Sequence, residues 1–218
     1  MNGYSGTVDR FEDRTEAGRR LGEALAERDL DADVVLAIPR GGLPLGRAVA
    51  DALDLPLDIA VASKIGAPGN PELAIGAVAS DGSAWLDEEA IAAMGVDEAY
   101  VSRERQREAE AAREKAERYR TDGPVDVTGR TAVLVDDGAA TGSTAIAAVR
   151  LLRSRGADRV VVALPVAPPE TVDELEAVAD EVVCLLTPAS FGAVGRFYRR
   201  FDQVSDEEAI AYLRAEDG

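Results

Sequence analysis

The fold is decided by the stretch from Val133 to Thr144, which reads VLVDDGAATGST. Its first three residues are aliphatic and typical of a buried β-strand. Asp136 and Asp137 follow directly, and a run of small and hydroxyl-bearing residues then leads into a segment with helical spacing. The stretch therefore predicts a strand, a tight loop and the start of a helix, with two carboxylates at the end of the strand.

The loop after the two carboxylates has the composition of an anion site. Small side chains let a ligand approach the backbone closely, and the free N–H groups at a helix N-terminus attract negative charge. Carboxylates beside a phosphate repel it unless they meet another group, so we expect Asp136 and Asp137 to hold the vicinal hydroxyls of a ribose 5-phosphate. The residues expected to bind its phosphate are Gly138, Ala139, Ala140, Thr141, Gly142, Ser143 and Thr144.

Two other nucleotide-binding motifs do not fit this stretch. A Walker A loop requires Gly-Lys followed by Ser or Thr, and no Lys is present in the loop. The glycine spacing also differs from that of a dinucleotide-binding fingerprint. A tight strand-to-helix turn in which the Asp side chains act only as caps stays open.

The rest of the chain alternates aliphatic strands with helical segments, which is typical of a parallel sheet. The expected strands lie at residues 34–38, 57–63, 131–135, 159–164 and 181–186. Helices are expected at 15–27, 44–53, 97–120, 143–155, 168–179 and 205–213. Gly and Pro residues predict an irregular loop over 64–71, and a hairpin is expected around Asp81-Gly82.

Two further features place cations near the ends of strands. Arg40, Gly41 and Gly42 follow the first strand; Arg suits a bidentate hold on phosphate oxygens, although a glycine turn without such a role fits as well. Lys64 ends the second expected strand, in a chain whose only other lysine is Lys115. Ligands of open parallel sheets bind beyond the carboxyl ends of the strands, so one ligand can reach these loops if their strands are neighbours.

Composition excludes several classes of function. The 218 residues include 41 acidic and 24 basic ones and no His, for a net charge of −17. Without His, neither a Ser-His-Asp triad nor a His-based zinc site is possible, and Cys184 in an apolar strand pattern predicts an inert thiol. An acidic surface repels nucleic acids and anionic membranes, so we expect neither as a partner.

The same composition bears on the environment of the protein. The acidic, lysine-poor surface fits simple solubility or a high-salt cytoplasm, and it resembles that of proteins from halophilic archaea. No apolar run approaches the roughly 20 residues that span a bilayer, and the first residues have no signal-peptide pattern. We therefore expect a single cytoplasmic domain.

The strand, the acidic pair and the Thr-Gly-Ser-Thr sequence at 141–144 together resemble the signature of the type I phosphoribosyltransferases. The resemblance implies an open, mostly parallel five-stranded sheet with helices on both faces. It implies one domain with a core at about 30–186 and a small hood built from about 1–28 and 187–218. It also implies binding of 5-phosphoribosyl 1-pyrophosphate (PRPP), with Mg²⁺ held mainly through PRPP, and a homodimer.

The resemblance also implies roles for the cationic loops. The turn at Arg40 would hold pyrophosphate, with a non-proline cis peptide at Arg40-Gly41 or next to it. Lys64 would contact pyrophosphate oxygens, and a flexible loop would follow it. The stretches 11–21, 64–74 and 191–198 resemble one subfamily in which the acceptor is not settled and an Arg usually precedes the Lys; Ser63 stands at that place here.

These features predict transfer of the phosphoribosyl group from PRPP to a nitrogen acceptor, with a nucleobase as the expected class. Arg40, Lys64, Asp136 and Asp137 would carry the reaction, and Phe191 is the candidate for stacking on a flat base. Hypoxanthine-guanine enzymes recognise the 6-oxo group of the base with a Lys that follows the strand after the phosphate-loop helix. Residues 164–168 stand at that place in this chain and include no Lys, so no purine is assigned. The alternatives are a catalytically silent PRPP sensor and, third, a hydrolase acting on a ribosyl phosphate.

Overall fold

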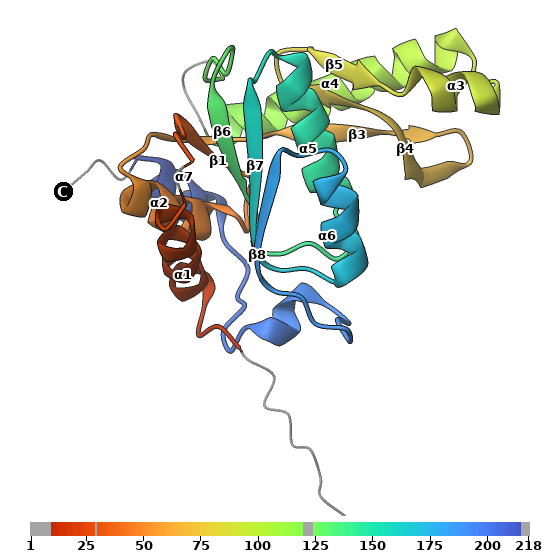
Figure 1. Cartoon of the computed structure of the whole chain (residues 1–218). Coiled ribbons are helices and arrows are strands. Elements are labelled where there is room, and N and C mark those ends of the chain that lie inside the picture. Colours follow the sequence, from red (N-terminus) through yellow and green to blue (C-terminus); the bar gives the residue numbers. More distant parts are fainter. Residues whose placement is uncertain (1–9, 29, 120–123, 215–218) are drawn as a thin grey trace, which may run out of the picture.

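The structure is a computed structural model, and it describes residues 10–28, 30–119 and 124–214. Five aliphatic segments form one parallel sheet in the order β2-β1-β6-β7-β8 (Figure 1). The strands are rich in apolar residues because helices cover both faces of the sheet. The expected parallel sheet is therefore confirmed. The strands are β1 (Val34–Ala37), β2 (Leu57–Ile59), β6 (Thr131–Val135), β7 (Arg159–Val166) and β8 (Glu181–Leu186).

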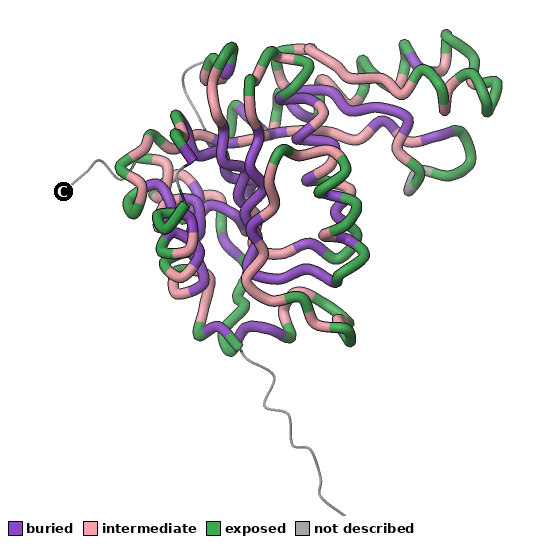
Figure 2. The backbone as a smooth tube through the Cα atoms, viewed as in Figure 1, coloured by how far each residue is buried: buried purple, intermediate pink, exposed green. Residues whose placement is uncertain are grey.

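Alternate side chains of the strands pack against two helical layers. Val133 and Val135 of β6 lie in the core shared with α1 (Arg14–Ala26) and α2 (Leu43–Leu53). Ala132 and Leu134 face the other way, into the core shared with the helices α5 and α6. Figure 2 shows the strands as the buried centre of the molecule. The two helices on this second face are α5 (Ser143–Ser154) and α6 (Pro169–Glu176).

A second, antiparallel sheet extends from the first together with two helices (Figure 1). It contains β3 (Ala62–Ala67), β4 (Asn70–Ala79) and β5 (Ala84–Leu86). The helices are α3 (Glu88–Met94) and the long α4 (Glu98–Tyr119), which agrees with the helix expected at 97–120. The expected hairpin is also confirmed, because β4 and β5 pair on either side of Asp81-Gly82.

The expectation of an irregular loop over 64–71 is wrong. Most of this stretch belongs to β3 and β4, which pair with each other and turn at Gly69, where φ is +75°. Ile65, Ile75 and Val101 of α4 form a small core of their own, and this burial outweighs the local preference of Gly and Pro for turns. The strand expected at 57–63 is likewise divided between β2 and β3.

The two ends of the described chain meet beside the large sheet. Phe11 and Tyr198 form a parallel bridge, and the backbone N–H of Phe11 donates to the carbonyl of Phe197 at 2.8 Å. Asp13 caps α1 by accepting from the N–H of Glu16 at 3.0 Å. This pairing brings the first turn of α1 to the segment that precedes α7 (Asp206–Arg214) and contains the 3₁₀ turn Val194–Phe197.

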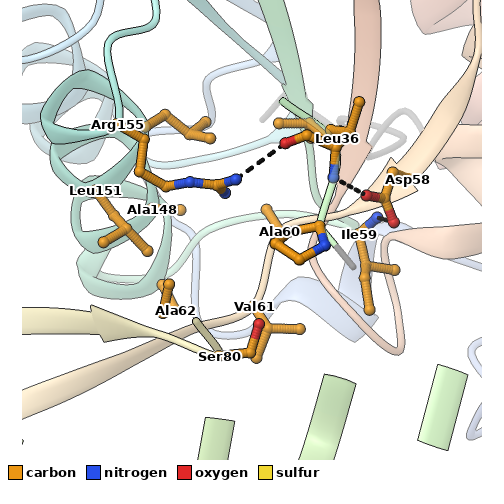
Figure 3. Close-up of a pocket in the computed structure, with 14 residues that line it drawn as sticks. Leu36, Asp58, Ile59, Ala60, Val61, Ala62, Ser80, Ala148, Leu151 and Arg155 are labelled. Carbon is orange, nitrogen blue, oxygen red and sulfur yellow. Dashed lines mark hydrogen bonds between the residues drawn. The ribbon is translucent and has the colours of Figure 1, made fainter. Parts of the chain in front are cut away.

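A small cavity of about 20 Å³ lies between α5 and the strands β1, β2 and β3, and Asp58 and Arg155 point toward one another across it (Figure 3). Asp58 accepts from the N–H of Val125 at 3.0 Å, and Arg155 donates to the carbonyl of Val125 at 2.9 Å. None of the expected site residues lines this cavity. Its polar groups hold the connector before β6 against the sheet.

Across the described part of the chain, each helix is either too short or too polar to cross a membrane.

Candidate functional site

The two loops that were expected to share a ligand lie side by side. β1 and β6 are parallel neighbours, with Ala37 opposite Val135, and the N–H of Ile38 donates to the carbonyl of Val135 at 2.9 Å. The chain after β1 enters α2 on one face of the sheet, and the chain after β6 enters α5 on the other. Strands that diverge in this way open a crevice at their carboxyl ends, where ligands of such sheets bind.

The loop after the acidic pair, residues 138–144 (the phosphate loop), surrounds an open hollow of about 110 Å³. Gly142 is the N-cap of α5, has a φ of +66° and supplies no side-chain cap, so the first N–H groups of the helix face the hollow. The hydroxyls of Thr141 and Ser143 lie 3.0 Å apart at its rim. The arrangement suits an anion by both its donors and the helix dipole.

Contacts with the neighbouring strand and helix fix the shape of the phosphate loop. The N–H of Ala139 donates to the carbonyl of Val166 at 3.0 Å, and the buried Thr171 hydroxyl donates to the carbonyl of Ala140 at 2.8 Å. Gly138 has a φ of +144°, and a Cβ there would lie 2.8 Å from a methyl group of Val194. The loop is therefore preorganised by protein contacts on its outer side, while its inner side stays open.

Asp137 is held from several directions. The guanidinium of Arg14 reaches its Oδ2 from Nε at 2.9 Å and from a terminal nitrogen at 2.8 Å, and both side chains are mostly buried. Arg14 also lies 3.8 Å from the centre of the Phe201 ring. The hydroxyl of Tyr198 donates to the Asp137 carbonyl at 2.6 Å. The terminal segments of the chain thus fix this carboxylate beside the sheet.

The two carboxylates influence each other's ionisation. Burial raises the pKa of Asp136 well above its usual range, and the negative charge of Asp137 raises it further. Burial also raises the pKa of Asp137, although Arg14 opposes this rise. Asp136 Oδ1 accepts from the N–H of Asp137 at 2.8 Å. A site with these shifts favours ligands that bring positive charge or hydroxyl donors to the carboxylates.

The turn at 39–42 (the Arg40 turn) lies next to the acidic pair. Its peptide bond between Pro39 and Arg40 is cis, which confirms the non-proline cis peptide that the resemblance implied at Arg40-Gly41 or next to it. Arg40 forms an ion pair with Asp206 of α7 at 3.3 Å, and the hydroxyl of Tyr119 donates to the same carboxylate oxygen at 2.9 Å. The guanidinium of Arg40 is therefore oriented at the rim of the crevice by two other elements.

The structure does not bring Lys64 into this constellation. Lys64 lies within β3, opposite Ala77, rather than at the end of the second strand as expected. It lines neither the hollow of the phosphate loop nor the cleft beside Arg40. Phe191 is half-buried and packs against Phe197, with 5.4 Å between ring centres. Their assigned roles stay predictions.

Sequence reasoning did not assign the roles of three residues that the structure places at the site. Arg14 and Tyr198 contact Asp137. Both lie in the stretches 11–21 and 191–198, which resemble the subfamily, but the sequence did not indicate that they reach Asp137. Lys115 of α4 lies near Asp136 and Arg40. Its rarity in the chain, which has only two lysines, was the available signal.

Comparison with known proteins agrees with this architecture. The family model for the phosphoribosyl transferase domain matches residues 7–199. A Mycobacterium tuberculosis H37Rv protein that is provisionally named a phosphoribosyl transferase is 45% identical over 204 residues, which is 93% of this chain and 46% of that protein. The chain thus spans about half the length of this curated relative.

A solved structure and a shorter match extend the comparison. The crystal structure of TT1426 from Thermus thermophilus has a TM-score of 0.88 and 46% identity, covering 94% of this chain and 97% of that one. A uracil phosphoribosyltransferase from Streptomyces griseus is 45% identical over 62 residues, which is 28% of this chain and 29% of that enzyme. The residues at the crevice and the extent of the family match lead to one conclusion: the chain belongs to the phosphoribosyl transferase family.

Proposed function

We propose that the protein transfers the 5-phosphoribosyl group of PRPP to a nitrogen acceptor of the nucleobase class and releases pyrophosphate. The observation that carries this proposal is the meeting of three parts at one edge of the sheet. These parts are the open phosphate loop, the partly buried pair Asp136 and Asp137, and the Arg40 turn. Each supplies the chemistry that one portion of PRPP requires.

In the proposed reaction the bond between ribose C1 and a pyrophosphate oxygen breaks, and a bond from C1 to the acceptor nitrogen forms. The acceptor loses one proton, and positive charge develops on the ribose ring as the leaving group departs. Asp136 and Asp137 bind the ribose hydroxyls and favour that charge. Arg40, the amides of Gly41 and Gly42, and Lys64 are assigned to the pyrophosphate. Catalysis of this kind depends on positioning and electrostatics rather than on His.

Mg²⁺ fits the donor groups of the site. In residues 10–28, 30–119 and 124–214, no cluster of three or more His, Cys, Asp or Glu could hold a metal ion by itself. Mg²⁺ is commonly bound through one or two carboxylates together with substrate phosphates, and Asp136 and Asp137 supply such carboxylates. When bound, Mg²⁺ supplies positive charge that stabilises the pyrophosphate leaving group.

The acceptor is assigned to the side of the crevice formed by the terminal segments. We propose that residues 1–28 and 187–218 act as a hood on a single-domain core at about 30–186, with Phe191 stacking on the base. The contacts of Phe11, Arg14 and Tyr198 support this assignment for the described part. A homodimer, a cytoplasmic location and a high-salt environment belong to the same proposal.

PRPP titration and a nucleobase panel test the proposal together. We expect PRPP to bind only with Mg²⁺, and pyrophosphate to be released when the correct base is added. Loss of the Thr141 hydroxyl in Thr141→Val removes one hydrogen bond to a charged group and should weaken PRPP binding about tenfold. Thr128→Val, in the connector before β6, should leave binding unchanged.

The outcomes separate the competing functions. PRPP binding without pyrophosphate release for any base would favour the sensor. Loss of PRPP with no acceptor present would favour the hydrolase. A wild-type protein that does not bind PRPP would remove all three interpretations of the site.

Arg14→Gln is expected to shift the pH dependence of PRPP binding. Asp137 binds the ribose in its ionised form, so binding is lost as the pH falls below the pKa of Asp137. Burial raises this pKa and Arg14 opposes the rise, so removal of Arg14 leaves Asp137 protonated up to a higher pH. The acidic limb of the binding curve should therefore move to higher pH, with about a tenfold loss of affinity near neutrality.

The measurement is the dissociation constant of PRPP between about pH 5 and 9, the range in which such shifts are read. Arg14→Lys retains a positive charge, so the acidic limb of its binding curve should lie closer to that of the wild type. Arg19→Gln, on an exposed position of the same helix, is the matched control. An equal loss of affinity at every pH would contradict the assignment of Arg14 to the ionisation of Asp137.

A further inference from the structure

A second hollow opens beside the Arg40 turn. This cationic cleft has a volume of about 430 Å³ and lies between the turn, α4 and α7. Residues 111, 115 and 118 of α4 recur at helical spacing and form one wall. The lining residues are Pro39, Arg40, Ala111, Glu114, Lys115, Arg118, Tyr119 and Asp206.

Cations outnumber anions around the cationic cleft, in a chain whose net charge is −17. Arg40, Lys115 and Arg118 face two acidic residues. One of these, Asp206, is engaged by Arg40 and by the hydroxyl of Tyr119. The cleft is therefore a local exception to the acidic surface, and an anion is the ligand that its charge favours.

Lys115 is less exposed than Ala111 and Arg118, the other two residues of this wall. It is half-buried, between the buried residues Ala112 and Ala116 of the same helix and the open cleft. Burial lowers its pKa, the nearby charge of Asp136 raises it, and that of Arg40 lowers it. Lys115 is therefore close enough to Asp136 and to Arg40 for both charges to act on its amine.

Several arginines of α4 are paired with glutamates of the same helix. Arg107 and Arg113 pair with glutamates of their own helix, with Arg113 at 3.0 Å from Glu110. Within the described residues, Lys115 has no such ion pair. A lysine that is half-buried and lines a cleft, without an ion pair to a glutamate of its own helix, is poorly explained as part of a solvated face.

We propose that Lys115, with Arg118 beside it, binds the pyrophosphate group of PRPP across the cationic cleft from Arg40. The assignment rests on the proposed function and adds a pyrophosphate contact from α4, an element to which the sequence assigned no ligand. Pyrophosphate presents oxygens to several donors at once, and cations from two walls can bind it without bringing their own charges together.

Titration with three ligands tests this assignment in the folded protein. PRPP, inorganic pyrophosphate and ribose 5-phosphate are titrated with Mg²⁺ into wild type, Lys115→Gln, Lys115→Arg and Arg113→Gln. Arg113→Gln removes the same charge from the same helix at an exposed position outside the cleft. Thermal unfolding of each variant shows whether the fold is retained.

We expect Lys115→Gln to weaken the binding of PRPP and of pyrophosphate about 10- to 100-fold, which is the effect of losing one hydrogen bond between charged groups. Ribose 5-phosphate should bind within about twofold of wild type, because it has no group in the cleft. Lys115→Arg should retain most of the affinity, and Arg113→Gln all of it.

Two results would overturn the assignment. An equal loss for ribose 5-phosphate would show that Lys115 acts only on Asp136 and the ribose site, and unchanged pyrophosphate binding would show that the cleft holds no pyrophosphate. A wild type that binds pyrophosphate through Lys115 but does not bind PRPP would instead contradict the proposed function and leave the anion site standing.

Discussion

Asp136→Asn is expected to weaken PRPP binding by at least about 100-fold while making the free protein more stable at neutral pH. The loss of affinity follows from the proposed role of Asp136. Its carboxylate accepts hydrogen bonds from ribose hydroxyls and attracts the metal and the developing ring charge, and a neutral amide does so far more weakly. Loss of charge-assisted interactions of this kind costs about 1.5–3 kcal/mol each.

The gain in stability follows from the raised pKa of Asp136. Burial and the charge of Asp137 raise this pKa in the folded state above the usual value of 3.8. The folded protein then binds more protons than the unfolded chain between those two pKa values, so stability falls as the pH rises through that window. Asn has no proton to lose, and it can still accept the hydrogen bond from the N–H of Asp137.

Thermal unfolding at several pH values, alongside PRPP titration, measures both effects. The melting temperature of Asp136→Asn should exceed that of wild type at neutral pH by about 2–4 °C for each kcal/mol gained. The difference should shrink toward zero below about pH 3, where the Asp136 carboxyl is protonated in both the folded and the unfolded state. Functional groups held at a cost to stability are expected at binding sites.

Asp126→Asn provides a control with the opposite sign. Hydrogen bonds from Thr128 lower the pKa of the exposed Asp126, so its replacement should not stabilise the protein at neutral pH. It should also leave PRPP binding unchanged. A less stable Asp136→Asn protein would contradict the placement of Asp136 in a partly buried, mutually repulsive pair.

The central part of the site could be predicted from the sequence because it is local. The strand, the acidic pair and the phosphate loop occupy consecutive positions, and their geometry follows from strand burial and from the start of α5. The Arg40 turn could be predicted for the same reason. The parallel sheet made these two local features neighbours, and this step needed only the alternation of strands and helices.

The parts that sequence reasoning missed depend on contacts between distant segments. Arg14 reaches Asp137 across 123 positions of the chain, and Tyr119 reaches Asp206 across 87. The hydrophobic periodicity of a sequence does not indicate contacts between residues so far apart in the chain. The prediction of a loop after Lys64 was wrong for a related reason. The core around Ile65 and Ile75 forms only when β3 and β4 pair, and the local Gly and Pro residues by themselves favour a loop.

Gly41→Ala is expected to abolish PRPP binding, with a loss of at least about 100-fold, through a single added methyl group. A Cβ on Gly41 would lie 2.2 Å from Oδ2 and 2.8 Å from Cγ of Asp137. The carboxylate cannot yield easily, because Arg14 binds the same oxygen from two nitrogens. The methyl group must therefore displace Asp137 from the ribose site, and a small misplacement of a binding group has a large effect on affinity and rate.

The same clash gives a test that does not depend on any ligand. In the wild-type background, overpacking by Gly41→Ala should lower the free energy of unfolding by about 1–3 kcal/mol. In an Asp137→Ala background the obstructing carboxylate is absent, so the same substitution should cost close to nothing. Unfolding of the two single variants and the double variant in urea measures this coupling.

Gly42→Ala separates this effect from a general disturbance of the turn. A Cβ on Gly42 would lie 2.7 Å from the carbonyl oxygen of Ile38 and 2.8 Å from that of Val135. Its obstacles are backbone atoms at the ends of β1 and β6, so its cost should persist in the Asp137→Ala background. If Gly41→Ala bound PRPP normally, Asp137 could leave its position without consequence, and the carboxylate would have no place in the ribose site.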